Sequence, residues 1–304
     1  DTPTTPMLDG GGGTDAPSAP VDAGPPTEVA GGDVSGDWCG NIHVTATARV
    51  PAGSTLTVCA GTLVSLDAGV SLTIEGTLTL AGTAAARVTL GPTAGGAAWA
   101  SLAVTGTLSG DFADIRTGTL CIDGGPASTI RLDDSTVVGC QRSMDLANAG
   151  TFDRTEIRGG VTLNVTGGIL RMTDSVLDLE RPVVGPDCTD WAGGGAILDH
   201  VWFTGCHCPI HINSSTLEVT ITNSIFDGAT NPVMIAQSVA TFHGNDFIGG
   251  GTLVLDIGRT GDIMADVSGN YWDGGSPDIG TTRPAQFTGA ADFSTTRIAG
   301  AGPR

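Results

Sequence analysis

The chain contains no lysine and no long apolar run. All 13 of its basic residues are arginine, against 32 acidic residues, and the formal net charge is −19. Binding to nucleic acid or anionic lipid depends on neutralising phosphates, so we expect neither partner. No apolar run reaches the roughly 18 residues of a membrane-spanning helix, so we expect no transmembrane segment. Cations and partners with basic patches are the compatible ligands.

Aromatic residues are also scarce, whereas glycine is abundant. Aromatics make up 5% of the 304 residues, and 47 residues are glycine. No stretch shows the periodicity of an amphipathic helix. This balance suits a core of stacked, small β-branched side chains that needs a turn residue at every corner.

A short phrase recurs through the second half of the chain at intervals of 20 to 26 residues. It reads apolar, any, Asp or Asn or a small residue, polar, any, apolar, any, Gly. The copies are LDDSTVVG from Leu132, FDRTEIRG from Phe152, MTDSVLDL from Met172, LDHVWFTG from Leu198, ITNSIFDG from Ile221, FHGNDFIG from Phe242 and VSGNYWDG from Val267, with a shorter form, FADIRTG, from Phe112. Such a period indicates a solenoid, in which no repeat buries its apolar face alone.

The spacing inside the phrase predicts the kind of solenoid. Apolar and polar residues alternate on both sides of the central position, which is typical of two short strands. The central residue tolerates a left-handed backbone, so it marks a sharp bend. The LxxLxL phrase of leucine-rich repeats is missing. We therefore predict an all-β chain that forms one elongated parallel β-helix.

Most of the chain resembles a known family. The successive segments VPAGSTLTV, AGTLVSL, SLTIEGTLTLAGT and ARVTL between Val50 and Leu90, Trp99 followed by SLAV, and VSGNYWDGGSPD from Val267 carry the resemblance. They are similar to bacterial right-handed parallel β-helix repeat proteins of the pectate-lyase-like superfamily, over roughly residues 37–290. The resemblance implies a single-stranded right-handed parallel β-helix, and relatives of this fold include polysaccharide lyases and glycoside hydrolases.

Composition divides the chain into three parts. Residues 1–34 are rich in Pro, Gly, Ala, Asp and Thr and predict a flexible tether. Residues 35–290 form the predicted β-helix, which Trp38 would cap, and residues 291–304 form a C-terminal tail. The tether resembles the spacer that follows the lipid-modified cysteine of bacterial surface lipoproteins. A lipid anchor and free secretion both stay open.

The seven cysteines indicate the compartment. Three pairs lie one lap apart: Cys39 with Cys59, Cys121 with Cys140, and Cys188 with Cys208. Equivalent positions in adjacent turns are about 4.8 Å apart, within the reach of a disulfide. We therefore predict three disulfides between turns and a location outside the cytoplasm. Cys206 competes with Cys208 for Cys188.

One acidic group is the catalytic candidate. Asp133 and Asp153 hold the same position in consecutive turns, beside Asp134 and Arg154. Glycoside hydrolases need two carboxylates across the sugar bond, and pectate-lyase chemistry uses a strong base beside carboxylates that bind Ca²⁺. The polygalacturonase pattern is incomplete, because no GHG follows and no RIK occurs. The competing interpretation assigns the acidic residues to bend geometry, at Asp114, Asp134, Asp174 and Asn223.

Two segments are candidates for metal binding. The first contains Cys206, His207, Cys208 and His211, all residue types that bind zinc or copper. A half-cystine corner with a surface histidine is the alternative. The second is the Gly-rich loop with Asp273 and Asp278, whose oxygens suit Ca²⁺. Calcium is the one cofactor that we consider.

Threonine pairs of the form TxT raise the question of an ice-binding ladder. They begin at Thr45, Thr55, Thr77, Thr105, Thr117 and Thr220. Because these intervals are uneven, we predict ordinary surface threonines that do not share one file.

We hypothesise an exported, non-catalytic protein that serves as a structural, adhesion or carbohydrate-binding module. A polysaccharide or another cell-surface component would be its partner. The alternative is a polysaccharide lyase or glycoside hydrolase that uses Asp133, Asp134, Asp153 and Arg154.

Overall fold

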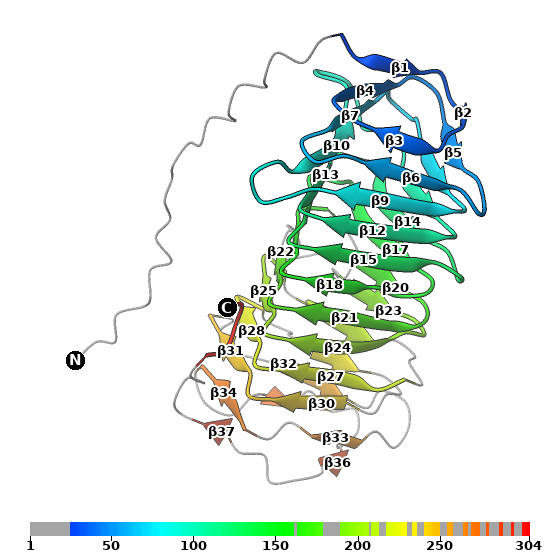
Figure 1. Cartoon of the computed structure of the whole chain (residues 1–304). Helices are drawn as coiled ribbons and strands as arrows, with labels where there is room; N and C mark the ends of the chain where they lie inside the picture. Colours follow the sequence, from blue (N-terminus) through cyan, green and yellow to red (C-terminus); the bar gives the residue numbers. More distant parts are fainter. Residues whose placement is uncertain are drawn as a thin grey trace.

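The computed structural model shows a parallel β-helix with three sheets (Figure 1). It describes residues 25–160, 163–178, 189–206, 208–212, 217–229, 240–249, 269–273 and 300–304. For residues 190, 233–235, 254–257, 264–266, 278–279, 286–287 and 293–294 it describes the backbone alone. All regular structure in these ranges is strand, and no helix in them could span a membrane. The predicted all-β fold is confirmed.

Each turn of the chain contributes one strand to each sheet, so every third strand belongs to the same sheet. The first sheet contains β1 (Thr27–Val29), β4 (Asn41–Val44), β7 (Leu63–Leu66), β10 (Val88–Pro92), β13 (Ala113–Arg116), β16 (Thr136–Val138), β19 (Glu156–Arg158), β22 (Val176–Asp178), β25 (Trp202–Thr204), β28 (Ile225–Asp227), β31 (Asp246–Ile248), β34 (Asn270–Trp272) and β37 (Phe293–Ser294).

The second sheet contains β2 (Gly32–Asp33), β5 (Ala48–Val50), β8 (Leu72–Ile74), β11 (Leu102–Val104), β14 (Leu120–Gly124), β17 (Arg142–Leu146), β20 (Leu163–Val165), β23 (Thr189–Trp191), β26 (Ile210–Ile212), β29 (Val233–Ile235), β32 (Val254–Ile257) and β35 (Asp278–Ile279). The third contains β3 (Gly36–Trp38), β6 (Thr55–Val58), β9 (Thr77–Ala81), β12 (Thr107–Asp111), β15 (Thr129–Asp133), β18 (Thr151–Asp153), β21 (Ile169–Thr173), β24 (Gly195–Asp199), β27 (Val219–Thr222), β30 (Ala240–His243), β33 (Met264–Asp266) and β36 (Gln286–Phe287).

The core consists of vertical files of aliphatic side chains. Leu56, Leu78 and Leu108 are in register on β6, β9 and β12, and all three are fully buried. Their neighbours along each strand point outward, because successive side chains of a strand alternate between faces. The period-two pattern of the sequence is therefore the pattern of core and surface.

Aromatic residues concentrate in one inner file of the first sheet. The rings of Phe203, Phe226, Phe247 and Trp272 stack, with successive centroids 4.6, 4.6 and 4.0 Å apart. Parallel, in-register strands place identical positions one above another, so aromatic residues in one position form a continuous column.

The predicted bend is present and joins the third sheet to the first. Asp134, Asp174 and Asn223 have φ values of 48°, 48° and 50°. Asp114 is not a bend residue, and the prediction is wrong there, because Phe112 adopts the left-handed conformation in that turn with φ of 46°. The side chain of Asp114 instead lies on β13, where it accepts hydrogen bonds from Arg87 and Thr136.

The position after each bend holds a buried file of small polar residues. These side chains accept hydrogen bonds from backbone N–H groups of the preceding turn. The bonds run from Ala113 to Ser135 at 3.0 Å, from Thr155 to Ser175 at 3.0 Å, from Val201 to Ser224 at 3.1 Å, from Ser224 to Asn245 at 2.8 Å and from Asn245 to Asn270 at 2.9 Å. The file satisfies backbone groups that the bend removes from the strand ladder.

The ends of the β-helix differ from the predicted boundaries. β1 and β2 pair with β4 and β5, so the strands begin at Thr27, ahead of residue 35. Most of the predicted tether, residues 1–24, lies outside the described residues. Trp38 is part of β3 in the first turn, with 8% of its surface exposed. β37 pairs with β34, within the predicted tail, and residues 300–304 lie near β25 and β28 (Figure 1).

Candidate functional site

The acidic candidates come together at the end of the third sheet. Asp111, Asp133 and Asp153 are in register at the ends of β12, β15 and β18. Adjacent strands are about 4.8 Å apart, so carboxylates of neighbouring turns stand side by side. The bend then places Asp134 and Arg154 next to this file.

Asp133 is the most buried of these acids. Only 5% of the residue is exposed, and its Oδ1 atom is buried without a hydrogen-bond partner. The other oxygen pairs with the Arg131 guanidinium. Burial raises the pKa of Asp133, and the negative charges of Asp111 and Asp153 add to this, whereas Arg131 opposes it. An acid that holds its proton more tightly is a candidate proton donor.

The neighbouring charges are already paired. Arg154 donates to both oxygens of Asp134, at 2.8 and 2.9 Å, and also contacts Asp153. The Arg154 hydrogen bond is the main cause that lowers the pKa of Asp134. The arginine therefore acts as a clamp between two turns. Because its Oδ1 is buried, Asp133 does not present that atom to a sugar in this conformation.

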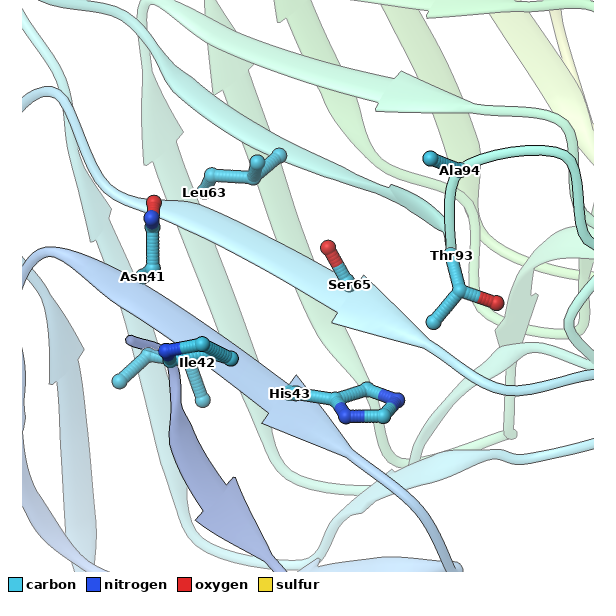
Figure 2. A pocket seen from close by; sticks show the side chains of 8 residues that line it. Asn41, Ile42, His43, Leu63, Ser65, Thr93 and Ala94 are labelled. Atoms are coloured by element: carbon cyan, nitrogen blue, oxygen red, sulfur yellow. The ribbon is translucent and has the colours of Figure 1, made fainter. Parts of the chain in front are cut away.

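A separate hollow of about 240 Å³ lies on the outer face of the first sheet. Figure 2 shows Asn41 and His43 of β4 beside Leu63 and Ser65 of β7, with Thr93 on the loop beyond. Asn41 is in register with Leu63, and His43 with Ser65. Leu63 is 42% exposed, and Ile197, on the third sheet, is the other exposed large hydrophobic residue of the described chain. The hollow thus combines an apolar platform with several hydrogen-bonding groups.

His43 is held between two carboxylates at the edge of this hollow. Its Nδ1 atom lies 3.0 Å from Glu28 and its Nε2 atom 2.9 Å from Asp67. The Asp67 hydrogen bond, followed by that of Glu28, raises the pKa of His43. The ring ties together β1, β4 and the turn after β7 through these two contacts.

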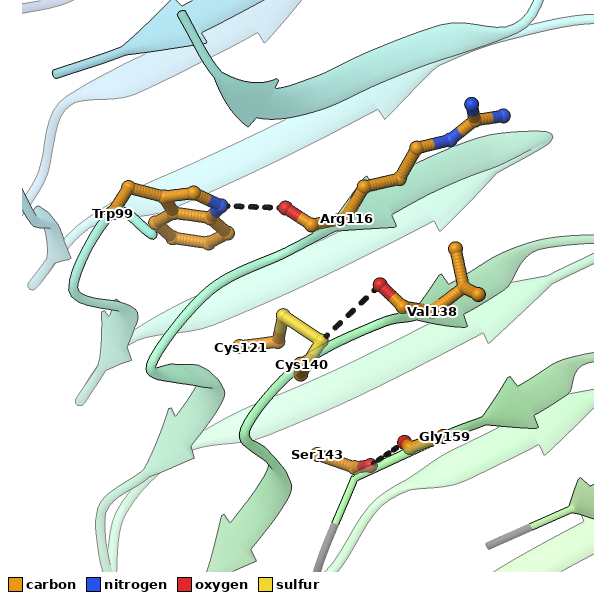
Figure 3. Close-up of a disulfide and its surroundings, with 7 residues drawn as sticks. All are labelled: Trp99, Arg116, Cys121, Val138, Cys140, Ser143 and Gly159. Atoms are coloured by element: carbon orange, nitrogen blue, oxygen red, sulfur yellow. Dashed lines mark hydrogen bonds between the residues drawn. A yellow bond between two sulfur atoms is a disulfide. The ribbon is translucent and has the colours of Figure 1, made fainter. Parts of the chain in front are cut away.

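Two of the predicted disulfides are present between turns, Cys39–Cys59 and Cys121–Cys140, with Cα atoms 5.0 and 5.8 Å apart. Figure 3 shows the second below Trp99, whose indole N–H donates to the carbonyl of Arg116 at 2.6 Å. The prediction for Cys208 is wrong, because Cys208 is a buried thiol. Cys206 is disulfide-bonded instead, as the competing alternative proposed. Cys188 lies outside the described residues.

The metal candidates do not converge in the described part of the chain. No group of three His, Cys, Asp or Glu side chains there has the arrangement of a metal site. His211 lies on the outer face of β26, whereas Cys206 and Cys208 are buried. Asp273 accepts hydrogen bonds from Gly249 and Tyr271. His207 and the side chain of Asp278 lie outside what the structure describes.

The threonine prediction is partly wrong. Thr55, Thr77, Thr107 and Thr129 share one outward file on β6, β9, β12 and β15. Their uneven intervals arise because loops of different length separate the strands. Register, not chain distance, decides which residues are neighbours.

Sequence reasoning missed a polar group around His200. His200 is 4% exposed, and its Nδ1 atom lies 2.8 Å from Asp199. Asp199 also accepts hydrogen bonds from Thr222 and Asn223, each at 2.7 Å. Burial raises the pKa of Asp199, but these three hydrogen bonds outweigh it, so the pKa is lowered. The recurring phrase of the sequence could have indicated this group, because His200 holds the same bend position in its turn as Asp174 and Asn223 do in theirs.

Comparison with known proteins does not assign a family. No family model, curated protein or solved structure matches the chain. The parallel β-helix therefore follows from strand register alone, and the resemblance to the pectate-lyase-like superfamily stays an expectation.

Proposed function

We propose that this chain is an exported, non-catalytic β-helix that binds a polysaccharide at the hollow beside Leu63. The observation that carries the proposal is the pairing of an exposed leucine with Asn41, Ser65 and Thr93 in one hollow. A sugar ring offers an apolar C–H face and a rim of hydroxyls, which this combination complements. The net charge of −19 disfavours uronate chains, so a neutral polysaccharide is the expected ligand.

The disulfides support an extracellular location. Disulfides persist in oxidising compartments and are rare in the cytosol. Two of them join successive turns, at Cys39–Cys59 and Cys121–Cys140. We further propose that the N-terminal segment is a tether. In one alternative it carries a lipid anchor that attaches the protein to the cell surface, and in the other the protein is secreted freely.

Affinity electrophoresis in gels that contain neutral or uronate polysaccharides tests the binding site. We expect a neutral polysaccharide to retard the protein and Leu63→Ser to weaken this. Covering the exposed part of Leu63 contributes about 1 kcal/mol, which is about fivefold in affinity. Ile197→Ser is the matched control, because Ile197 is similarly exposed on another sheet. Equal weakening by both substitutions, or no retardation by any polysaccharide, contradicts the proposal.

A polysaccharide lyase or glycoside hydrolase is the second candidate. The raised pKa of Asp133 beside Asp153 is the observation that favours it. Adjacent turns place the two carboxylates near the separation of about 5 Å used by retaining glycosidases. The same polysaccharides are assayed for new reducing ends and for unsaturated products. Turnover that disappears in a folded Asp133→Asn variant would establish the enzyme and end the non-catalytic proposal.

A further inference from the structure

The bends of three successive turns form a seat for residues 300–304. Asp174, His200 and Asn223 follow β21, β24 and β27, and all have positive φ. The Gly302 N–H donates to the Asn223 carbonyl at 2.8 Å, and the Arg304 N–H donates to Asp174 Oδ1 at 3.2 Å. The Arg304 guanidinium reaches His200 Nε2 at 2.6 Å. Each bend thus holds one hydrogen bond from a segment more than 70 residues further along the chain.

The seat accepts this segment by shape as well as by hydrogen bonding. Gly302 is buried and has φ of 92°. A Cβ atom there would lie 2.6 Å from Ile225 Cδ1, so a side chain would displace the segment. Ile225 is on the outer face of β28, beside Trp202 in register on β25. The segment therefore covers part of an apolar stretch of the first sheet.

The contact with His200 requires the neutral ring. Asp199 is a charged carboxylate that accepts three hydrogen bonds, and it faces Nδ1 of His200. Nδ1 therefore carries the proton, and the lone pair of Nε2 accepts from the Arg304 guanidinium. A proton on Nε2 would replace this acceptor by a donor and bring two positive charges together. The other charged group at the seat is Asp174, which accepts from the Arg304 backbone.

We propose that residues 300–304 are a strap that acidification releases through His200. In the closed state the strap covers Nε2 of the Asp199–His200 pair and lies against the turns that contain Asp174, His200 and Asn223. Protonation of His200 removes the acceptor, and the segment leaves its seat. Release uncovers the His200 ring and the apolar side chain of Ile225. This inference is independent of the polysaccharide site, which lies at the other end of the first sheet.

Amide hydrogen exchange of Gly302 measures the strap directly, because its N–H is bonded only when the strap is closed. We compare protection factors from about pH 8 to about pH 5, across the range in which histidines titrate. Protection of Gly302 should fall as the pH decreases across this range, because a proton on Nε2 removes the acceptor for Arg304. The Ile221 amide, inside β27, should keep its protection.

Two variants distinguish the release of the strap from a general destabilisation of the protein at low pH. His200→Gln keeps a hydrogen-bond acceptor that takes up no proton, so its Gly302 protection should not vary with pH. Arg304→Met should lower the protection of Gly302 at every pH and leave Ile221 unchanged. The proposal is overturned if wild-type protection of Gly302 is the same at both ends of the range. It is equally overturned if the pH dependence persists in His200→Gln or, should that variant not fold, in Arg304→Met.

Discussion

At the scale of single residues, Asp133 and His43 show how burial and pairing select opposite protonation states. Asp133 is buried with an unsatisfied oxygen, so the fold favours its neutral form. His43 lies between two carboxylates, so the fold favours its charged form. Both pKa values are raised, and for both groups stability decreases as pH rises through the raised pKa.

The substitution Asp133→Asn tests whether ionisation of Asp133 destabilises the folded protein. Asparagine resembles the protonated acid, so the free energy of unfolding should increase by about 1 kcal/mol at pH 7. Arg131 is 59% exposed, so losing its ion pair costs little. Below about pH 3, where the wild-type acid is protonated in both states, the difference should vanish. Urea unfolding at the two pH values provides the measurement.

Asp153→Asn is the control for that experiment. Asp153 holds the same register position one turn later, but its side chain is 30% exposed and contacts Arg154. We expect a small loss of stability at pH 7 rather than a gain. A gain in both variants would mean that the effect of Asp133→Asn reflects overall charge reduction and not burial.

For His43 we expect the stability of the first turns to depend on pH in a higher range. The ion pairs with Asp67 and Glu28 stabilise the first turns fully below about pH 6.5 and are lost as pH rises through the raised pKa. Amide exchange in β1 and β4 should therefore accelerate with pH more than intrinsic exchange does. His43→Gln should remove this extra dependence, and its persistence in the variant would contradict the assignment.

At the scale of elements, the bends depend on the file of small polar residues behind them. Ser224 accepts from Val201 N–H at 3.1 Å and donates to the Thr222 carbonyl at 2.8 Å. Val201 is an apolar member of the file, as Ala113 is, and it offers no hydroxyl to the Ser175 N–H. The file is thus interrupted at the turn of Val201.

Two substitutions in this file should change the free energy of unfolding in opposite directions. Ser224→Ala leaves the buried Val201 N–H without an acceptor and should cost about 1 to 3 kcal/mol. Val201→Thr has nearly the same shape and supplies the missing hydroxyl, so it should stabilise by about 1 kcal/mol. Chemical denaturation of both variants gives the two values. A destabilised Val201→Thr protein would show that the hydroxyl does not reach Ser175.

At the scale of the whole molecule, the disulfides pin successive turns of the rod. Cys121 and Cys140 enclose a sequence separation of 19 residues, and Cys39 and Cys59 one of 20. Loops of this length give a disulfide a stabilising effect of about 3 kcal/mol. The net charge of −19 destabilises the compact state through self-repulsion, and the disulfides offset part of this effect.

Thiol titration tests this arrangement. Of the seven cysteines, Cys208 carries a thiol and Cys206 is a half-cystine. We expect one thiol per denatured, unreduced chain, and very slow labelling of the native protein because Cys208 is buried. Cys208→Ser should give no thiol. Two or more thiols in that variant would contradict the pairing.

Local patterns predicted much of the architecture. The recurring phrase located the bends at Asp134, Asp174 and Asn223, and one-lap spacing identified two disulfides. The same reasoning failed at Asp114, where the bend lies two residues earlier, and for the threonine file, whose members are separated by loops of unequal length. The number of residues between two positions predicts whether they are in register only where the turns have equal length.

The sequence by itself determined the parallel β-helix, the acidic surface and the turn-to-turn disulfides, because alternation, turn residues and lap length act between near neighbours in the chain. Only the tertiary structure decided which polar groups meet. It paired Cys206 rather than Cys208, buried Asp133 beside two other acids, and brought Arg304 to His200. Such contacts depend on exact register and on a returning segment 104 residues away, and no local pattern encodes either.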